Sequence, residues 1–319
     1  MELIIKPTGT CNMACTFCAA SEIESPILKK PQKEILDVID RLNPNSLIFT
    51  GGEPLMMPPE YYYYFLEKYP EINIDMTSNL KDFYLNPEKW EKLFKHKNVS
   101  ICTSFNFGNT RKWSKNEVYS KDKFVKVMNL FKNRIEYMPP FIAVIDKDNE
   151  DTVLDTVLLA KDLGTTCRIN NALKIGRQDK YYPRYKIFKK WLNIIDAGLE
   201  EYEINCRDRS IGRCPINSNG LCTFSIRCIY IDNNGKIHYS NCEDKVNLGY
   251  NDLSIEDDEL SVKPIKYNDL ISMECLSCEL YSICNSCESN REQIKRYAPE
   301  HCEHMSKLKD RIIEAGWKL

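Results

Sequence analysis

Long apolar runs are missing from this chain of 319 residues. Its first residues, MELIIKPTG, hold a short apolar stretch that Lys6 and Pro7 interrupt. That stretch is shorter than the apolar region of a secretory leader, and no other run approaches the about 20 residues of a transmembrane helix. We therefore expect a protein that has no leader, does not associate with membranes and resides in the cytoplasm.

An excess of either charge is also missing. The 44 basic and 46 acidic residues leave a net charge of −2, whereas general nucleic-acid binding typically requires a strongly basic surface. Hydrophobic residues make up 43% of the chain and charged residues 28%, which is ordinary for a folded globular protein. The composition thus argues against a general nucleic-acid binder and against a disordered chain.

Histidine is scarce, with 4 residues, whereas cysteine is abundant, with 15. Because disulfides are rare in a reducing compartment, so many cysteines predict metal or redox chemistry. Cys102 and Cys167 stand alone in apolar or β-branched surroundings, where we expect buried, inert thiols. His301 and His304 flank Cys302 and are candidate ligands, although a polar helix start explains them equally well.

Three cysteines crowd the N-terminal stretch GTCNMACTFCAAS. Cys11, Cys15 and Cys18 follow the pattern C-x3-C-x2-C, and no histidine or fourth cysteine lies nearby. A structural zinc site requires four ligands, so three thiols suit an iron–sulfur cluster that leaves one iron open to a small chelating ligand. A zinc site completed by a distant residue remains the alternative, and the later C-x2-C pairs also resemble zinc knuckles.

Strand-like and helix-like segments alternate over the first two thirds of the chain. The strand-like segments are LIIKP, SLIFT, INIDMTSN, VSICTSFN, FIAVID and TTCRINNA. The helix-like segments include KEILDVIDRL (residues 33–42), EDTVLDTVLLAKDLG, which Gly164 should end, and the long YPRYKIFKKWLNIIDAGLEEY (residues 182–202). Repeated β–α units predict an α/β fold whose parallel sheet is covered by helices. Chemistry in such folds lies on the loops after the strands, which is where the cysteine loop and the sequence GGEP (residues 51–54) occur.

C-x3-C-x2-C after the first strand together with GGEP after the second resembles the radical S-adenosylmethionine (SAM) family, over roughly residues 1–200. The resemblance implies a partial (β/α)6 TIM-like barrel. It also implies a [4Fe–4S] cluster on Cys11, Cys15 and Cys18, with SAM chelating the fourth iron. The implied SAM contacts are Phe17 beside the adenine, Gly51, Gly52, Glu53 and Pro54 at the methionine amino group, and Ser78, Asn79, Ser104 and Arg168 at the ribose and carboxylate.

The C-terminal cysteines resemble the SPASM extension, which binds two auxiliary [4Fe–4S] clusters. The resemblance implies one cluster on Cys222, Cys228, Cys242 and Cys287 and a second on Cys275, Cys278, Cys284 and Cys302. The segment CIYIDNNGKIHYSNC resembles the opening hairpin of that extension, and Asn-Gly is a strong hairpin turn signal. The usual C-x2-C-x5-C-x3-C run here ends in x2.

The resemblance divides the chain into a barrel at residues 1–203 and a small, Cys-rich α+β auxiliary-cluster domain at residues 204–319. Cys206 and Cys214, just after that boundary, could replace a ligand, bind a substrate or be structural, and we favour a structural or secondary role. Because the first strand begins at Glu2, we expect no fused leader-binding domain.

The implied activity is reductive cleavage of SAM to a 5′-deoxyadenosyl radical, which abstracts hydrogen from a substrate C–H bond. We expect oxidation or cross-linking of a peptide or protein side chain, with a flavodoxin or ferredoxin as electron donor. A nucleotide, sugar or other small-molecule substrate is the alternative. Glu243, next to Cys242, is a candidate base, although Asp244 competes and a solvated hairpin end explains both. A zinc-binding interaction module would leave GGEP unexplained.

Overall fold

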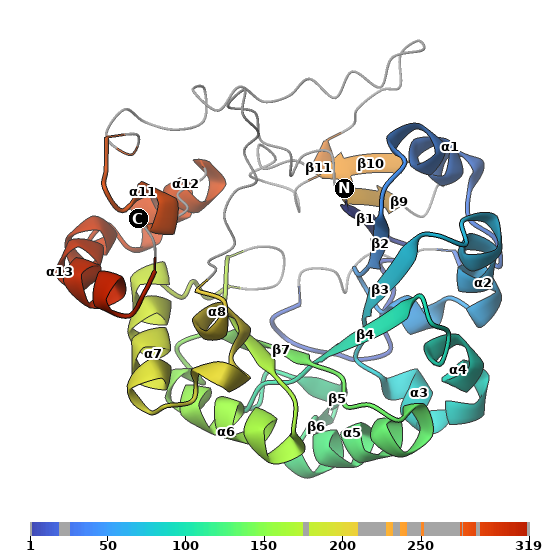
Figure 1. Cartoon of the computed structure of the whole chain (residues 1–319), viewed down its shortest axis with the longest axis horizontal. Coiled ribbons are helices and arrows are strands. Elements are labelled where there is room, and N and C mark those ends of the chain that lie inside the picture. The colour runs from blue at the N-terminus through green and yellow to red at the C-terminus, as the bar shows by residue number, and fades with distance from the viewer. Residues whose placement is uncertain are drawn as a thin grey trace. The chain divides into compact units, whose positions relative to one another are not determined.

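The computed structural model (Figure 1) describes residues 2–18, 26–174, 179–209, 228–231, 237–240, 250–251, 275, 277–284 and 288–317. The predicted site residues Cys222, Cys242, Glu243 and Cys287 lie outside these ranges, as does Cys214. No helix in the described ranges is both long enough and apolar enough to cross a bilayer.

A sheet of β–α units forms the body of the fold. Its strands run in the order β11-β10-β9-β1-β2-β3-β4-β7-β8. β1 pairs in parallel with β2, β2 with β3, and β3 with β4. The six strands of the β–α units are β1 (Glu2–Lys6), β2 (Ser46–Phe49), β3 (Asn73–Thr77), β4 (Val99–Ser104), β7 (Phe141–Ile145) and β8 (Cys167–Asn171). This order confirms the predicted α/β class and the partial (β/α)6 barrel.

Helices follow the strands along the chain, and Figure 1 shows α1, α2 and α4 on the outer side of β1–β4. The helices of the β–α part are α1 (Lys33–Leu42), α2 (Pro59–Lys68), α3 (Lys81–Leu85), α4 (Pro87–Phe94), α5 (Lys121–Ile135), α6 (Val153–Leu163), α7 (Arg184–Asp196) and α8 (Ile204–Arg207). Short 3-10 turns occur at η1 (Pro54–Met56), η2 (Glu150–Thr152) and η3 (Glu200–Tyr202). A small hairpin, β5 (Lys112–Ser114) and β6 (Glu117–Val118), is inserted after β4.

Local sequence signals account for the helix ends. Pro59 is the first residue of α2, where its missing N–H costs nothing. Ser120 caps α5 by accepting from the Lys123 N–H at 3.3 Å. Gly164 ends α6 with φ 69°, a left-handed conformation that favours glycine.

One predicted helix is too long. The segment from residue 182 to 202 was expected to be a single helix, but α7 ends at Asp196. Gly198, with φ 65°, reverses the chain there, and η3 is a separate turn. Apolar residues continue at helical spacing beyond Gly198. Periodicity alone takes no account of the tendency of glycine to end a helix.

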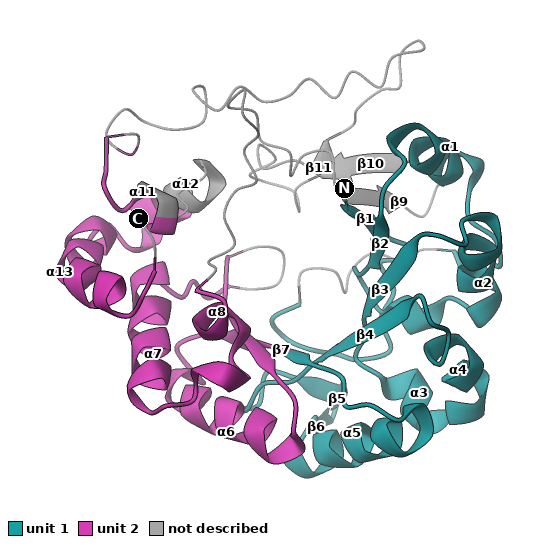
Figure 2. Ribbon diagram, viewed as in Figure 1, with its two compact units in different colours: residues 1–141, 226–241, 250–259 teal, residues 142–225, 242–249, 260–319 magenta. Residues whose placement is uncertain are grey.

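Two compact units divide the chain, and their boundary falls inside β7 (Figure 2). Unit 1 comprises Met1–Phe141, Ile226–Asn241 and Tyr250–Glu259; unit 2 comprises Ile142–Ser225, Cys242–Gly249 and Leu260–Leu319. These units do not follow the expected boundary at residues 203 and 204, which stays a prediction.

The predicted hairpin after Cys228 is present as two antiparallel strands, β9 (Cys228–Ile231) and β10 (Ile237–Ser240). β11 (Tyr250–Asn251) adds to β10. β9 also pairs in parallel with β1, with Cys228 opposite Ile4. The hairpin thus extends the sheet at the strand that leads into the cysteine loop, which the sequence did not indicate.

The C-terminal segment of unit 2 is helical, with α11 (Tyr281–Cys284), α12 (Glu288–Tyr297) and α13 (His301–Glu314). α13 packs on α7, where Arg311 pairs with Asp196 at 2.8 Å. The Trp317 ring stacks on Trp191 at a centroid distance of 6.3 Å, so the chain end is tied to the core of this unit.

Candidate cluster and cofactor site

The cysteine loop, residues 11–18, is hydrogen-bonded to residues 110–112, which follow β4. The Ala14 N–H donates to the Lys112 carbonyl at 3.2 Å, and the Thr16 N–H donates to the Thr110 carbonyl at 2.9 Å. The Cys15 thiol also approaches the Lys112 carbonyl at 3.9 Å. These contacts fix the backbone between the three thiols although no regular element contains it.

The GGEP loop touches the chain immediately before Cys11. The Gly52 N–H donates to the Thr8 carbonyl at 2.9 Å, and the Glu53 N–H donates to the Thr10 carbonyl at 2.8 Å. A Cβ at Gly52 would lie 2.3 Å from the Thr10 oxygen, so only glycine permits this approach. The GGEP motif is therefore hydrogen-bonded, backbone to backbone, to the segment that leads into the cysteine motif.

Glu53 is 1% exposed, and its carboxylate accepts three hydrogen bonds. The donors are the Ser78 hydroxyl at 2.6 Å, the Asn79 N–H at 2.7 Å and the Leu55 N–H at 3.1 Å. Burial raises the pKa of Glu53 to about 7, although the donors act against this. The side chain joins the GGEP loop to the loop after β3, which makes it a positioning residue.

Asn79, which donates to Glu53 through its backbone, also contacts the cysteine loop through its side chain. Its Nδ2 donates to the Asn12 Oδ1 at 2.9 Å and lies 3.6 Å from the Cys11 Sγ. The structure therefore brings Asn79, Glu53 and Cys11 together, while the Ser78 hydroxyl is engaged by Glu53 and by the Leu80 N–H.

Lys81 is a site residue that sequence reasoning missed. Its Nζ donates to the Asn12 carbonyl at 2.8 Å and to the Trp113 carbonyl at 2.5 Å, and it lies 5.1 Å from the Trp113 ring centroid. Burial lowers the pKa of Lys81, while the nearby Cys11 opposes that shift. A lysine at the start of a short helix carried no recognisable signal in the sequence.

We expect Lys81→Met to loosen the cysteine loop, because two carbonyls lose a charged donor. The expected cost is about 2 kcal/mol in unfolding free energy, together with faster iron release from reconstituted protein. Urea unfolding and release to a coloured iron chelator measure these effects. Lys89→Met is the control, because Lys89 makes an exposed pair with Asp82, a kind of pair worth under about 1 kcal/mol. Equal losses in both variants would contradict this role of Lys81.

Arg111, also missed, is the buried cation of the site and is 6% exposed. Its Nη1 donates to the Ser104 hydroxyl at 2.9 Å and its Nε to the Asn106 Oδ1 at 3.0 Å. The guanidinium carbon lies 5.0 Å from the Phe17 ring centroid. Two predicted SAM-contacting residues, Phe17 and Ser104, are thus gathered around a charge that the sequence left unassigned.

The charge of Arg111 interacts with the three thiols. It acts to lower the pKa of Cys15, which burial raises, and it couples more weakly to Cys18 and Cys11. Within the described ranges, no carboxylate forms an ion pair with Arg111. A buried guanidinium that has only neutral partners requires an anion, and thiolates that hold a cluster supply one.

Burial raises the pKa of Cys11 to about 12, so the thiol is protonated in the chain without metal. Ligation replaces that proton with iron and releases it. Among the described residues, no three His, Cys, Asp or Glu side chains converge tightly enough for a single metal ion. The donor set of three thiols and the nearby Arg111 charge fit a [4Fe–4S] group.

Arg168 lies in unit 2 as the second residue of β8, and its side chain is exposed. The hydrogen bond from Arg207 lowers the pKa of Asp208, and the charge of Arg168 adds a smaller effect in the same direction. The sequence placed Arg168 near the end of the strand, whereas Asn171 ends β8. Its contact with SAM stays a prediction.

A second group of thiols assembles in unit 2. Burial raises the pKa of Cys284 to about 12, and Cys302, Cys275 and Cys278 raise it further, so these three thiols lie near enough to interact electrostatically with Cys284. With Cys284 they are the four residues expected to hold one auxiliary cluster, and His301 joins them with Nε2 3.2 Å from the Cys284 Sγ. Cys228, assigned to the other auxiliary cluster, is the first residue of β9.

Two isolated cysteines belong to the core. Cys206 is 0% exposed, its thiol approaches the Trp191 carbonyl at 3.6 Å, and its N–H donates to Glu203 at 2.7 Å. This environment supports a structural role rather than ligation. Cys167, also 0% exposed, is buried as predicted.

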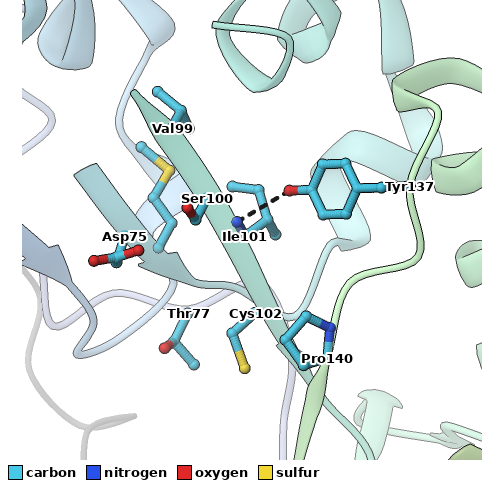
Figure 3. A pocket seen from close by; sticks show the side chains of 9 residues that line it. Asp75, Thr77, Val99, Ser100, Ile101, Cys102, Tyr137 and Pro140 are labelled. Carbon is cyan, nitrogen blue, oxygen red and sulfur yellow. Dashed lines mark hydrogen bonds between the residues drawn. The ribbon is translucent and has the colours of Figure 1, made fainter. Parts of the chain in front are cut away.

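Cys102 is half-buried rather than buried, because it lines a pocket of about 350 Å³ in unit 1 (Figure 3). Asp75 and Ser100 also line it from neighbouring strands. At its wall, the Tyr137 hydroxyl accepts from the Ile101 N–H at 3.1 Å. The pocket therefore combines a carboxylate, a hydroxyl and a thiol with apolar walls.

Comparison with solved structures finds the same fold elsewhere. A structure described as histidine-tagged anSMEcpe with bound AdoMet matches at 19% identity and TM-score 0.64, over 98% of each chain. Streptococcus suis SuiB bound to S-adenosylmethionine matches at 19% identity and TM-score 0.61, over 94% of this chain and 75% of that one. SuiB bound to the precursor peptide SuiA matches at 18% identity and TM-score 0.59, over 94% and 74%.

No curated protein sequence matches the chain. The family model described as the radical SAM superfamily matches residues 5–160, a range that contains the cysteine loop, GGEP and Arg111. Over these residues the chain is similar to the radical SAM superfamily.

Proposed function

We propose that the chain is an enzyme that cleaves SAM reductively at a [4Fe–4S] cluster held by Cys11, Cys15 and Cys18. One observation carries the proposal: the GGEP loop is hydrogen-bonded to the chain immediately before Cys11, and the charge of the buried Arg111 interacts with the thiols. The radical SAM domain match supports the same chemistry.

The residues around the thiols have distinct tasks in this proposal. Asn79 and Lys81 hold the cysteine loop, and Gly51 and Gly52 let backbone groups approach the methionine end of SAM. Arg111 balances negative charge at the thiolates or at the SAM carboxylate. When bound, the cluster and SAM supply a 5′-deoxyadenosyl radical that takes hydrogen from a substrate C–H bond.

We further propose a peptide or protein side chain as the substrate, which would be oxidised or cross-linked. The similarity to SuiB, solved with a precursor peptide, supports this class. Two auxiliary clusters would accept the substrate electron, with the thiols around Cys284 holding one of them. A flavodoxin or ferredoxin would donate the initiating electron in the reducing cytoplasm, and Glu243 remains the proposed base.

Anaerobic incubation of iron-replete protein with SAM and dithionite tests the proposal. We expect 5′-deoxyadenosine and methionine from the wild-type chain, and a loss to the background level in the variant with Cys11, Cys15 and Cys18 all changed to Ala. That variant should retain the iron of the auxiliary clusters. Absence of 5′-deoxyadenosine from iron-replete wild-type protein would refute the activity.

The substrate class requires a separate measurement. Mass spectrometry of candidate peptides after the same incubation should show a loss of two hydrogens per oxidation or cross-link. Turnover of nucleotides or sugars without any peptide product would replace the peptide proposal with the small-molecule alternative. Colourless protein that contains zinc instead of iron would favour an interaction module.

A further inference from the structure

His301 is the first residue of α13 and is 1% exposed. Its Nε2 lies 3.2 Å from the Cys284 Sγ. In the part of the chain that the structure describes, its Nδ1 is buried without a hydrogen-bond partner. The imidazole therefore has one polar contact, and that contact is a thiol of the proposed auxiliary cluster.

The direction of this hydrogen bond follows from ligation. A cysteine that holds iron is a thiolate and can only accept. The Nε2 must then carry the proton, which fixes the tautomer of the ring and leaves Nδ1 as a lone pair. A buried lone pair is tolerated better than a buried unpaired N–H, so the orphan Nδ1 agrees with this assignment.

The protein holds the ring in this place. The Tyr185 ring lies edge-on to His301 at 6.0 Å, and the Tyr185 hydroxyl donates to Glu300, the residue before α13, at 3.0 Å. The neighbouring His304 stacks on Tyr185 at 4.4 Å. The start of α13 thus presents one histidine to Cys284 and the other to an aromatic ring.

We propose that His301 is a positioning residue that donates from Nε2–H to the Cys284 thiolate and raises the reduction potential of the cluster on Cys275, Cys278, Cys284 and Cys302. This inference rests on the proposed function, because it requires that cluster. Hydrogen bonds to ligating sulfur withdraw electron density and favour the reduced cluster, whose negative charge is larger.

The test uses the variant with Cys11, Cys15 and Cys18 changed to Ala, in which only auxiliary clusters bind. A redox titration followed by electron paramagnetic resonance measures the midpoint of each step. In His301→Phe, we expect one midpoint to fall by about 59 mV, which is a tenfold change in the ratio of reduced to oxidised cluster for one electron. The other auxiliary step should not move.

Two further variants make the result specific. His301→Gln keeps an N–H donor and should restore most of the midpoint. His304→Phe, on the same helix but directed at Tyr185, should leave both midpoints unchanged. If circular dichroism shows that His301→Phe is unfolded, His301→Leu replaces it with the same expectation.

The remaining outcomes distinguish failure of this inference from failure of the proposed auxiliary clusters. Unchanged midpoints in fully loaded His301→Phe would overturn the inference and leave the auxiliary clusters standing. An iron-free background variant would overturn the proposed auxiliary clusters and the inference with them. If His301→Phe and His301→Gln each lose about four irons while Cys302→Ala keeps them, His301 is a ligand of the cluster. Donation from His301 to the Cys284 thiolate is then refuted.

Discussion

Gly52→Ala is expected to reduce 5′-deoxyadenosine formation about 100-fold and unfolding free energy by about 3 kcal/mol. The added Cβ would lie 2.3 Å from the Thr10 oxygen and 2.6 Å from the Gly9 carbonyl. Both obstacles are backbone atoms, so no side-chain rotation relieves them. The GGEP loop must move away from the segment that leads into Cys11, and the groups that face SAM move with it.

Gly164→Ala is the matched control for this substitution. Gly164 has φ 69°, but a Cβ there meets nothing within 4 Å. The control therefore carries only the strain of a left-handed alanine, about 1 kcal/mol, and should keep its rate of SAM cleavage. Initial rates under saturating SAM and urea unfolding compare the two variants. Equal rates would show that the contact between the loops does not position the site.

The second large effect concerns the pH dependence of stability. The folded pKa of Glu53 is about 7, against an ordinary value of 4.5. Between these values the native chain keeps a proton that the unfolded chain has lost, so stability falls as pH rises. The difference corresponds to about 3 kcal/mol, lost between about pH 4.5 and 7.

Glu53→Gln has no such proton, so the stability of the wild-type chain relative to this variant should decline over that range. Urea unfolding of iron-free protein at a series of pH values measures the decline. Glu60→Gln, on the exposed face of α2, serves as the comparison and should follow the wild-type curve. Parallel curves for wild type and Glu53→Gln would mean that the three donors keep the carboxylate ionised throughout.

The sequence predicted the elements of this fold well where periodicity and caps agree. The helix over residues 33–42, the strand before GGEP and the glycine that ends α6 were all identified, because each depends on neighbouring residues. The attachment of β9 to β1 escaped prediction because it joins residues more than 200 positions apart. No local pattern encodes such a pairing.

The site residues that could be predicted from the sequence are those that lie at fixed separations along the chain. The three cysteines and the two glycines occur at fixed sequence separations, so their motifs can be recognised without a structure. Lys81 and Arg111 act through long side chains from loops of arbitrary length, and only the fold shows which carbonyls and rings they reach. Glu53 was assigned to the ligand from its motif, whereas its three donors show that it ties two loops together.

Arg111 has a consequence for how the protein is made. A guanidinium stays protonated throughout the physiological range, so its charge persists before any iron arrives. Until sulfur anions balance it, this positive charge stays buried among neutral groups, which lowers the stability of the iron-free chain. Maturation should therefore be coupled to iron supply, and chains produced during iron starvation should be degraded sooner than fully loaded ones.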